Sequence, residues 1–279
     1  MRIFIAIGAA LLGAMALDPA VGQGRLNDSN GPSPAISAEA IVNLRADEIV
    51  RHIDNSRFPS HYFKLVNTVD EFKDGRRVAS AIFSTFAGRH AVGGEVSSAA
   101  VYQFPKQDSG KSILYRDNQI WFYDNIARST VRLSPAQRLL GQASAADVLM
   151  VDFGRQYSPH LLGRERITDY EGREIDCVVL ELTEPISNAQ YSEVRIWFDI
   201  STQRMARADY YSDTGRSLKS AYYADHKEIF GSYRPTKTVI IDSVNPRNVT
   251  VITSSDFGSA AIREDWFRRS NLRNISLSK

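Results

Sequence analysis

Two strand-like stretches decide the fold of this 279-residue chain, Ile120-Trp121-Phe122-Tyr123 and Val194-Arg195-Ile196-Trp197-Phe198. Successive side chains of a β-strand point to opposite faces, so both stretches place bulky groups on more than one face of a sheet. A sheet with one face in water does not need this arrangement. The second face therefore either packs against helices as core or lines an apolar cavity.

Strand signals continue outward from both stretches. Period-two alternation predicts strands near residues 63–69, 78–83, 96–104 and 113–115, and then over Arg164–Tyr170, Glu174–Thr183, Glu193–Asp199, Met205–Tyr211, Ser217–Ile229, Thr236–Asp242 and Asn248–Phe257. Short turn signals such as Lys73-Asp74-Gly75 and Asp213-Thr214-Gly215 separate them, which favours antiparallel hairpins. We predict a mainly β (α+β) protein with one large curved antiparallel sheet of about eleven strands and helices on one face.

Helical signals occur at the start and in the middle of this pattern. Ser37 is a candidate N-cap for a helix whose apolar residues recur at roughly helical spacing, namely Ile41, Leu44, Ile49 and Ile53. Ser134-Pro135 opens one short helical candidate, and Ser144–Phe153 forms a second. The strand meander is therefore predicted to carry two inserted helices.

The alternation also predicts which side chains share the concave face of the sheet. Trp121 and Tyr123 are expected on the opposite face, and Trp197 is expected between the charged Arg195 and Asp199 on the wetter side. The residues expected to line a hydrophobic ligand-binding cavity on the concave face are Ile120, Phe122, Val194, Ile196 and Phe198.

The inserted segment carries more apolar surface than such short helices require. Its apolar residues are Leu139, Leu140, Val148, Leu149, Met150 and Phe153. We expect this surface to be buried against the concave face. The segment is then either a lid whose contacts are exchangeable for acyl chain or a permanent plug that completes the core.

The N-terminus predicts export. Met1-Arg2 precedes an uncharged apolar run that ends at Asp18-Pro19, and Ala20-Val21-Gly22 supplies small residues for cleavage. The run is shorter than the ~20 residues of a membrane-spanning helix, so residues 1–22 are interpreted as a signal peptide. Residues 23–36 are interpreted as a flexible lead, and no linker divides residues 37–279, which are predicted to form one domain.

Composition and motifs argue against several functions. The 34 Lys+Arg and 32 Asp+Glu residues are interspersed, so no nucleic-acid partner is expected. There is no nucleophile elbow, His-Glu-x-x-His or phosphate-binding loop, and the five histidines lack metal-ligand spacing. No catalytic residue, metal or cofactor is expected, and Cys177 is interpreted as a buried apolar residue.

Several longer motifs resemble one known family. They include Gly110-Lys111-Ser112-Ile113-Leu114-Tyr115, Asn118-Gln119-Ile120-Trp121-Phe122-Tyr123-Asp124, Arg132–Gly141, Ile196-Trp197-Phe198-Asp199 and Tyr233-Arg234-Pro235-Thr236-Lys237. In this order the chain is similar to the outer-membrane lipoprotein-sorting proteins, over residues from about 40 to about 275.

The resemblance implies a LolA/LolB-like fold, an open antiparallel half-barrel whose mouth is closed by helices. It also implies a non-enzymatic periplasmic carrier or chaperone that binds acyl chains of a lipoprotein or lipid. Such a carrier moves them between the inner and outer membranes, with an inner-membrane lipid exporter as partner and with transient membrane contact. Two alternatives stay open: an envelope enzyme acting on lipid or glycan, and a structural cell-envelope assembly protein whose aromatic faces are core or subunit interface.

Overall fold

A computed structural model describes residues 45–59, 61–90, 94–134, 137–149, 152–183 and 191–275. The chain divides into two compact units, Met1–Gly31 and Pro32–Lys279, and every described residue belongs to the second. The predicted signal peptide, the predicted lead and the start of the predicted helix at Ser37 lie outside the described residues.

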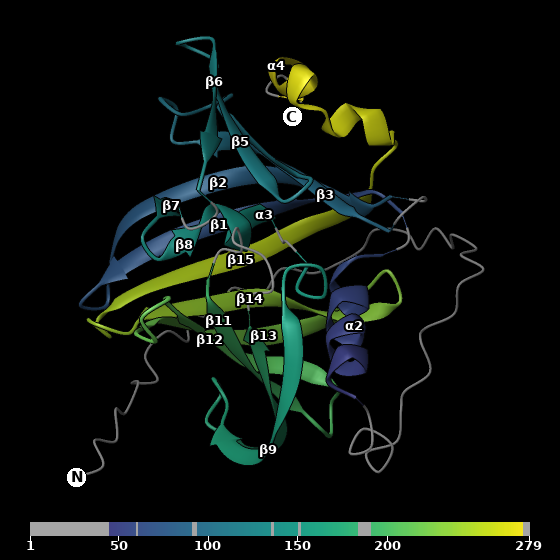
Figure 1. The fold of residues 1–279 in the computed structure, drawn as a ribbon. Coiled ribbons are helices and arrows are strands. Elements are labelled where there is room, and N and C mark those ends of the chain that lie inside the picture. Colours follow the sequence, from purple (N-terminus) through teal and green to yellow (C-terminus); the bar gives the residue numbers. More distant parts are fainter. Residues whose placement is uncertain are drawn as a thin grey trace, which may run out of the picture. The chain divides into compact units, whose positions relative to one another are not determined.

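One antiparallel sheet of thirteen strands dominates the described residues (Figure 1). Its first half is a meander of β1 (Phe63–Lys73), β2 (Arg76–Arg89), β3 (Val96–Phe104), β4 (Ser112–Arg116), β5 (Gln119–Asp124) and β6 (Ser129–Leu133). Its second half is a meander of β9 (Ser158–Thr168), β10 (Glu174–Thr183), β11 (Glu193–Asp199), β12 (Arg204–Tyr211), β13 (Ser217–Ile229), β14 (Ser232–Asp242) and β15 (Asn248–Ser259). The sheet order is β6-β5-β4-β3-β2-β1-β15-β14-β13-β12-β11-β10-β9.

The two halves are joined by their first and last strands. β1 pairs with β15 over residues that are far apart in the chain, as in the partners Val69 and Ile252. β6 and β9 are the two edges and do not pair with each other, so the sheet stays an open half-barrel. The predicted fold class is therefore confirmed.

Tight turns account for the hairpins. Asp74 and Gly75 join β1 to β2 with φ values of 51° and 76°, and Asp117 and Asn118 join β4 to β5 with φ values of 52° and 55°. Two-residue loops with positive φ at both positions match the right-handed twist of paired strands. The sheet has more strands than predicted partly because β6 was missed: its side chains are largely exposed and show no apolar alternation.

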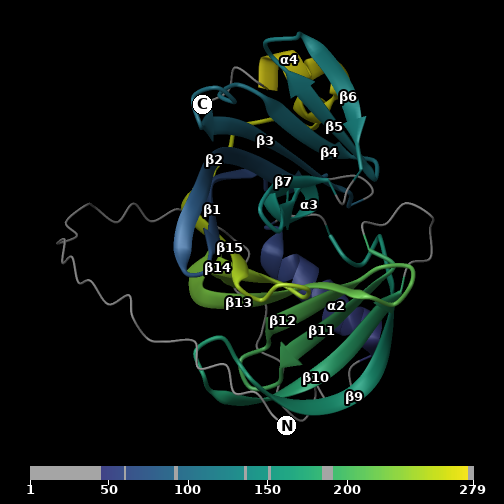
Figure 2. The ribbon, with the colours of Figure 1, turned by 90° about the vertical axis from the view of Figure 1, so that its left-hand side faces the viewer.

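Two helices occupy the concave side of the sheet, between its two halves (Figure 2). Helix α2 (Ala46–Arg57) has Asp47 and Glu48 in its first turn and Arg57 in its last, which suits the helix dipole. It buries Ile49, Val50 and Ile53 in the main core. Helix α3 (Ala145–Leu149) packs against β2, β3 and β4.

The prediction of a short helix over Ser134–Leu140 is wrong. The described residues of this region instead form β7 (Arg138–Leu140), which pairs with β8 (Ala143–Ser144) in a separate two-stranded sheet. Gly141 turns the hairpin with φ 54°, and a Cβ there would meet the Thr250 side chain of β15. Tertiary contact with β15 therefore overrides the local Ser-Pro helix signal.

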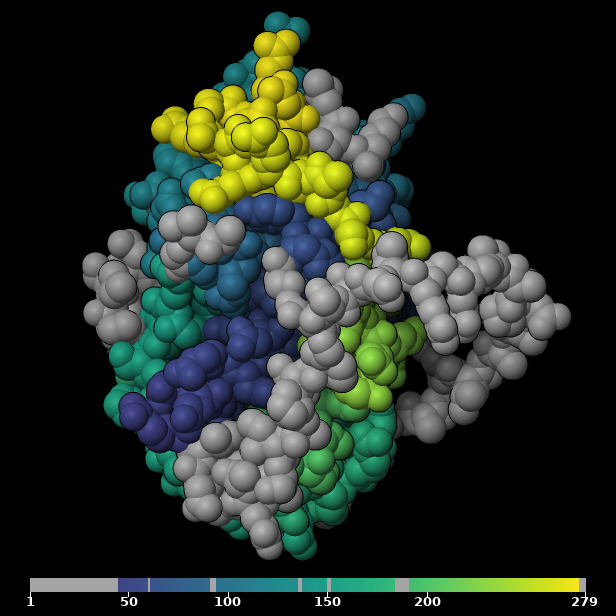
Figure 3. Space-filling view, turned by 90° about the vertical axis from the view of Figure 1, so that its right-hand side faces the viewer, coloured from purple at the N-terminus to yellow at the C-terminus, as the bar shows by residue number. Residues whose placement is uncertain are grey.

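The C-terminal segment covers the other face of the first half. It comprises the 3₁₀ turns η1 (Glu264–Phe267) and η2 (Arg269–Asn271) and helix α4 (Leu272–Ile275). Its residues Phe267, Leu272 and Ile275 are fully buried against Phe86 of β2, Leu114 of β4 and neighbouring residues. Figure 3 shows this segment, in yellow, over the first half of the sheet and away from the purple α2.

Candidate functional site

The five residues predicted for the concave face lie in one apolar cluster with α2 and α3. Ile120, Val194, Ile196 and Phe198 are buried, and Phe122 is half-buried against them. The alternation sorts their neighbours onto the opposite face, where Trp121 and Tyr123 pack under the C-terminal segment and Trp197 packs near Cys177. The expectation of a wetter side at Trp197 is wrong, since this residue is only 5% exposed. The role of the five residues in ligand binding stays a prediction.

The inserted segment packs into the same cluster. Val148 and Leu149 of α3 are fully buried, and Phe153 is nearly so. Leu139 and Leu140 are half-buried at its margin. Met150 lies outside the described residues. The segment therefore covers apolar residues of the concave face, as a lid or a plug must.

A cavity of about 90 Å³ lies between α2, α3 and strands β1 and β12–β15. Of the described residues that were predicted for the cavity or the lid, Phe153 alone lines it. Most of its lining was missed by sequence reasoning, including the side chains of Arg57, Tyr157, Tyr191, Tyr210, Tyr223 and Arg234. Tyr210 and Tyr223 lie on adjacent strands and their hydroxyl groups are 3.0 Å apart. Strand pairing places Tyr210 opposite Lys219, four residues before Tyr223, so strand register alone does not predict the contact between the two hydroxyl groups.

A buried ion pair fastens α3 to the sheet beside this cavity. Nζ of Lys219 on β13 donates to the Asp147 carboxylate at 2.5 Å, and both side chains are almost completely shielded from water. The same carboxylate accepts hydrogen bonds from the Ser144 backbone and hydroxyl groups at 2.7 Å. Burial by itself would lower the pKa of Lys219, but the charge of Asp147 raises that pKa above its ordinary value. Lys219 therefore stays protonated and paired.

A second set of polar contacts fastens the chain that follows α3. The buried carboxylate of Asp54 on α2 accepts hydrogen bonds from the amides of Phe153 and Gly154 at 2.8–3.1 Å. Asp152 beside it is 2% exposed, and its Oδ1 has no hydrogen-bond partner among the described residues. Burial, and then the charge of Asp54, raises the pKa of Asp152 to about 6.

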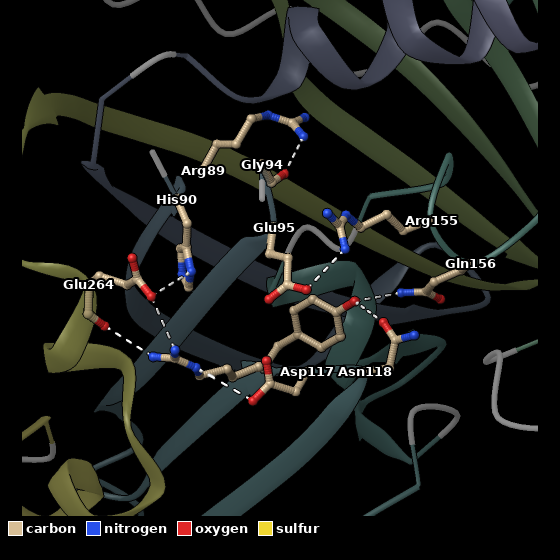
Figure 4. Close-up of polar contacts among 11 residues, drawn as sticks. Arg89, His90, Gly94, Glu95, Asp117, Asn118, Arg155, Gln156 and Glu264 are labelled. Atoms are coloured by element: carbon tan, nitrogen blue, oxygen red, sulfur yellow. Dashed lines mark hydrogen bonds and ion pairs between the residues drawn. The ribbon is translucent and has the colours of Figure 1, made fainter. Parts of the chain in front are cut away.

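Figure 4 shows how the same chain segment reaches the end of β4. Gln156 donates to the Tyr115 hydroxyl at 2.9 Å, and that hydroxyl donates to Asn118 at 2.9 Å. Arg155 forms an ion pair with Glu95 at 3.0 Å. The cover of the concave face is thus held by directional polar contacts as well as by apolar packing, whereas the sequence predicted apolar contacts alone.

The described residues contain no group of three or more His, Cys, Asp or Glu side chains placed to hold a metal ion. Burial raises the pKa of the Cys177 thiol to about 12. Within the same residues, no helix combines the length and the apolar character needed to cross a bilayer.

An open antiparallel half-barrel with helices packed in its concavity defines the LolA-like class, and the resemblance seen in the sequence is confirmed. A family model described as "Uncharacterized protein" matches residues 94–274, and the chain belongs to that family. No curated protein matches the sequence.

Three solved structures share the fold. A LolA superfamily protein from Nitrosomonas europaea is 26% identical with a TM-score of 0.72, covering 81% of this chain and 99% of its own. A DUF1329 family protein from Desulfovibrio piger is 22% identical with a TM-score of 0.69, covering 81% and 97%. An outer membrane lipoprotein-sorting protein domain from Vibrio parahaemolyticus is 16% identical with a TM-score of 0.69, covering 85% and 100%.

Proposed function

We propose that this protein is a periplasmic carrier that binds acyl chains of a lipoprotein or lipid on the concave face of its half-barrel. The observation that carries the proposal is the apolar concave face, covered by α2 and by a short inserted segment, the β7–β8 hairpin with α3, rather than by a second large sheet. A second large sheet would cover the face permanently. A short segment inserted between β6 and β9 leaves an acyl chain the option of taking its place.

The volume of the cavity supports a closed state without cargo. Pockets that hold small molecules have volumes of about 300–1,000 Å³, whereas this cavity has about 90 Å³. An acyl chain therefore requires α3 and the chain after it to move away from the sheet. Each methylene that then leaves water contributes about 0.8 kcal/mol, so roughly a dozen offset the entropy cost of association.

The predicted signal peptide supports a site of action in the periplasm. Together with the lipoprotein-sorting domain from Vibrio parahaemolyticus that shares the fold, it supports transfer between the inner and outer membranes. We propose an inner-membrane lipid exporter as the donor of the cargo and only transient contact with either membrane. The proposed activity is binding and transfer, without a chemical step.

The test combines native mass spectrometry with a binding assay. The protein purified from the envelope of its host should carry co-purified acylated molecules, and the delipidated protein should bind a fluorescent fatty acid. Protein without acyl species that also fails to bind the probe would contradict the proposal.

A matched pair of variants then locates the binding surface. Leu149→Asp places a charge in the core under α3, and Leu161→Asp places the same charge on β9, where Leu161 is 50% exposed. If α3 is a lid, L149D abolishes probe binding and keeps a cooperative thermal melt, while L161D changes neither. If α3 is a plug, L149D also collapses the melt, because an unpaired buried charge is costly. An L149D protein that melts and binds like the parent would move the site elsewhere.

A further inference from the structure

One cation of the cavity lacks a counterion. Arg234 on β14 lines the cavity and is only 2% exposed. Its Nη1 donates to backbone carbonyl groups of Ile229 and Ser232, but its Nε and Nη2 have no hydrogen-bond partner among the described residues. Burial alone lowers the pKa of this guanidinium, to about 10, and no carboxylate of the described residues raises it. A buried guanidinium without a counterion lowers the stability of the folded protein. An unsatisfied buried polar group of this kind can mark a binding site for an ion or ligand.

Two nearby carboxylates do not supply that partner: Asp147 lines the cavity, and Asp54 on α2 lies outside its lining. Asp147 is neutralised by Lys219 at 2.5 Å. Asp54 faces Arg57 at 3.8 Å and is engaged by two backbone amides. Both carboxylates thus already have cations of their own, and Arg234 adds a positive charge that no described carboxylate balances.

The other lining groups suit an anion at the end of an apolar chain. Arg57 is a second guanidinium on the same cavity, and its Cζ lies 5.0 Å from the centroid of the Phe153 ring. The hydroxyl groups of Tyr210 and Tyr223 are 3.0 Å apart, so one of them donates a hydrogen bond to the other. The accepting hydroxyl can still donate its own proton to a ligand. Ile252 and Phe257 supply apolar lining beside these donors. The planar fork of a guanidinium donates two parallel hydrogen bonds to a carboxylate or phosphate group.

We infer that the cavity between α2, α3 and β13–β15 binds the anionic oxygen group, carboxylate or phosphate, of an amphiphile whose acyl chain lies on the concave face. The inference rests on the proposed function, and it adds the chemical class of the cargo. Arg234 completes its hydrogen bonds when the anion arrives, so the carrier discriminates charged from neutral amphiphiles of equal chain length.

The experiment compares two ligands of equal chain length, dodecanoate and dodecanol, at pH 7.5. Each displaces a fluorescent fatty acid from the delipidated protein without its predicted signal peptide. The wild type should bind dodecanoate about tenfold or more tightly than dodecanol. Arg234→Met should remove this preference by weakening dodecanoate binding alone. Arg234→Lys, which keeps the charge and loses the fork, should restore part of it.

Arg204→Met is the matched control. Arg204 lies on β12, stacks on the Tyr233 ring at 3.9 Å and does not line the cavity, so its replacement should leave the preference intact. Thermal melts of each variant without ligand exclude unfolding as the cause. R234M should melt at the same or a higher temperature than the parent, because it removes an unpaired buried charge.

Three outcomes overturn the inference in different ways. Equal affinity of the wild type for both ligands removes the anion site and leaves acyl binding standing. Failure to bind either ligand removes the proposed function as well. Displacement of dodecanoate by millimolar inorganic phosphate, with R234M abolishing the competition and leaving dodecanoate affinity unchanged, assigns the site to free phosphate instead of an amphiphile.

Discussion

At the scale of single residues, Asp152 shows how burial makes a side chain sensitive to pH. Asp152 belongs to the chain segment that follows α3, and its carboxyl group is buried near Asp54. Burial, and then the charge of Asp54, raises its pKa to about 6. Above pH 6 the folded protein holds a buried charge that the unfolded chain would solvate. As pH falls from 6 towards 4, the folded state takes up the proton before the unfolded chain does, so the destabilising contribution disappears.

We therefore expect Asp152→Asn to stabilise the protein by about 1–2 kcal/mol at pH 7.5 and to have little effect near pH 4. Urea unfolding at the two pH values measures this difference. Asp213→Asn is the control, because Asp213 is exposed in the turn between β12 and β13. A variant that is destabilised at pH 7.5 would show that Asp152 is stabilised in its charged form.

At the scale of elements, α3 is too short to hold itself in place. It has five residues, and isolated helices shorter than about twelve are marginal in water. Its position depends on Val148 and Leu149 in the core, on the hydrogen bond from Asn67 to the Val148 carbonyl at 3.3 Å, and on the pair of Asp147 with Lys219. The first contact is apolar and exchangeable for lipid, whereas the ion pair is specific.

Lys219→Met should destabilise the protein by about 3 kcal/mol, since it leaves the Asp147 carboxylate buried without its cation. Adding Asp147→Asn should recover part of this loss, and a double-mutant cycle by urea unfolding measures the coupling at about 1–3 kcal/mol. If α3 is a lid, the double variant also binds a fluorescent fatty acid faster in stopped flow.

The control pair for this cycle is Lys111 and Asp108, which are 2.7 Å apart and more exposed. Lys111→Met should cost less than about 1 kcal/mol, as exposed ion pairs usually do. Equal losses in K219M and K111M would mean that the buried pair does not fasten α3.

At the scale of the whole sheet, the two faces have different tasks. The concave face gathers α2, α3 and the predicted ligand surface, while the C-terminal segment seals the opposite face of β2–β5 with Phe267, Leu272 and Ile275. Arg116 and His90 hold Glu264 of this segment at 3.3 and 3.2 Å (Figure 4). The seal and the cavity share no residue, so stability and ligand binding should respond separately to mutation.

Phe267→Ala should therefore destabilise the protein by about 3–5 kcal/mol, because it empties a fully buried aromatic site. Its affinity for the acyl probe should stay within about twofold of the parent at a temperature where it remains folded. Arg268→Ala, at the exposed neighbouring position, should change stability by no more than about 0.5 kcal/mol. Loss of probe affinity in F267A would show that the two faces are coupled.

The sequence alone determined the local and periodic features of this protein. Period-two alternation predicted most strands, and the turn signal Lys73-Asp74-Gly75 marked the hairpin between β1 and β2. The alternation at Val194–Phe198 separated the two faces, despite a register shift between Trp197 and Phe198. These features depend on neighbours within a few residues, so they can be predicted without knowledge of tertiary contacts. The resemblance to the lipoprotein-sorting family identified the open half-barrel.

Only the tertiary structure decided what lies between the elements. The pairing of β1 with β15 joins residues about 180 positions apart, and it places Thr250 where Gly141 must turn, which replaces a predicted helix with the β7–β8 hairpin. The cavity likewise draws Arg57 from α2, Tyr210 from β12 and Arg234 from β14. Neither hydrophobic periodicity nor a motif links these three residues, because they line one cavity only after distant strands have paired.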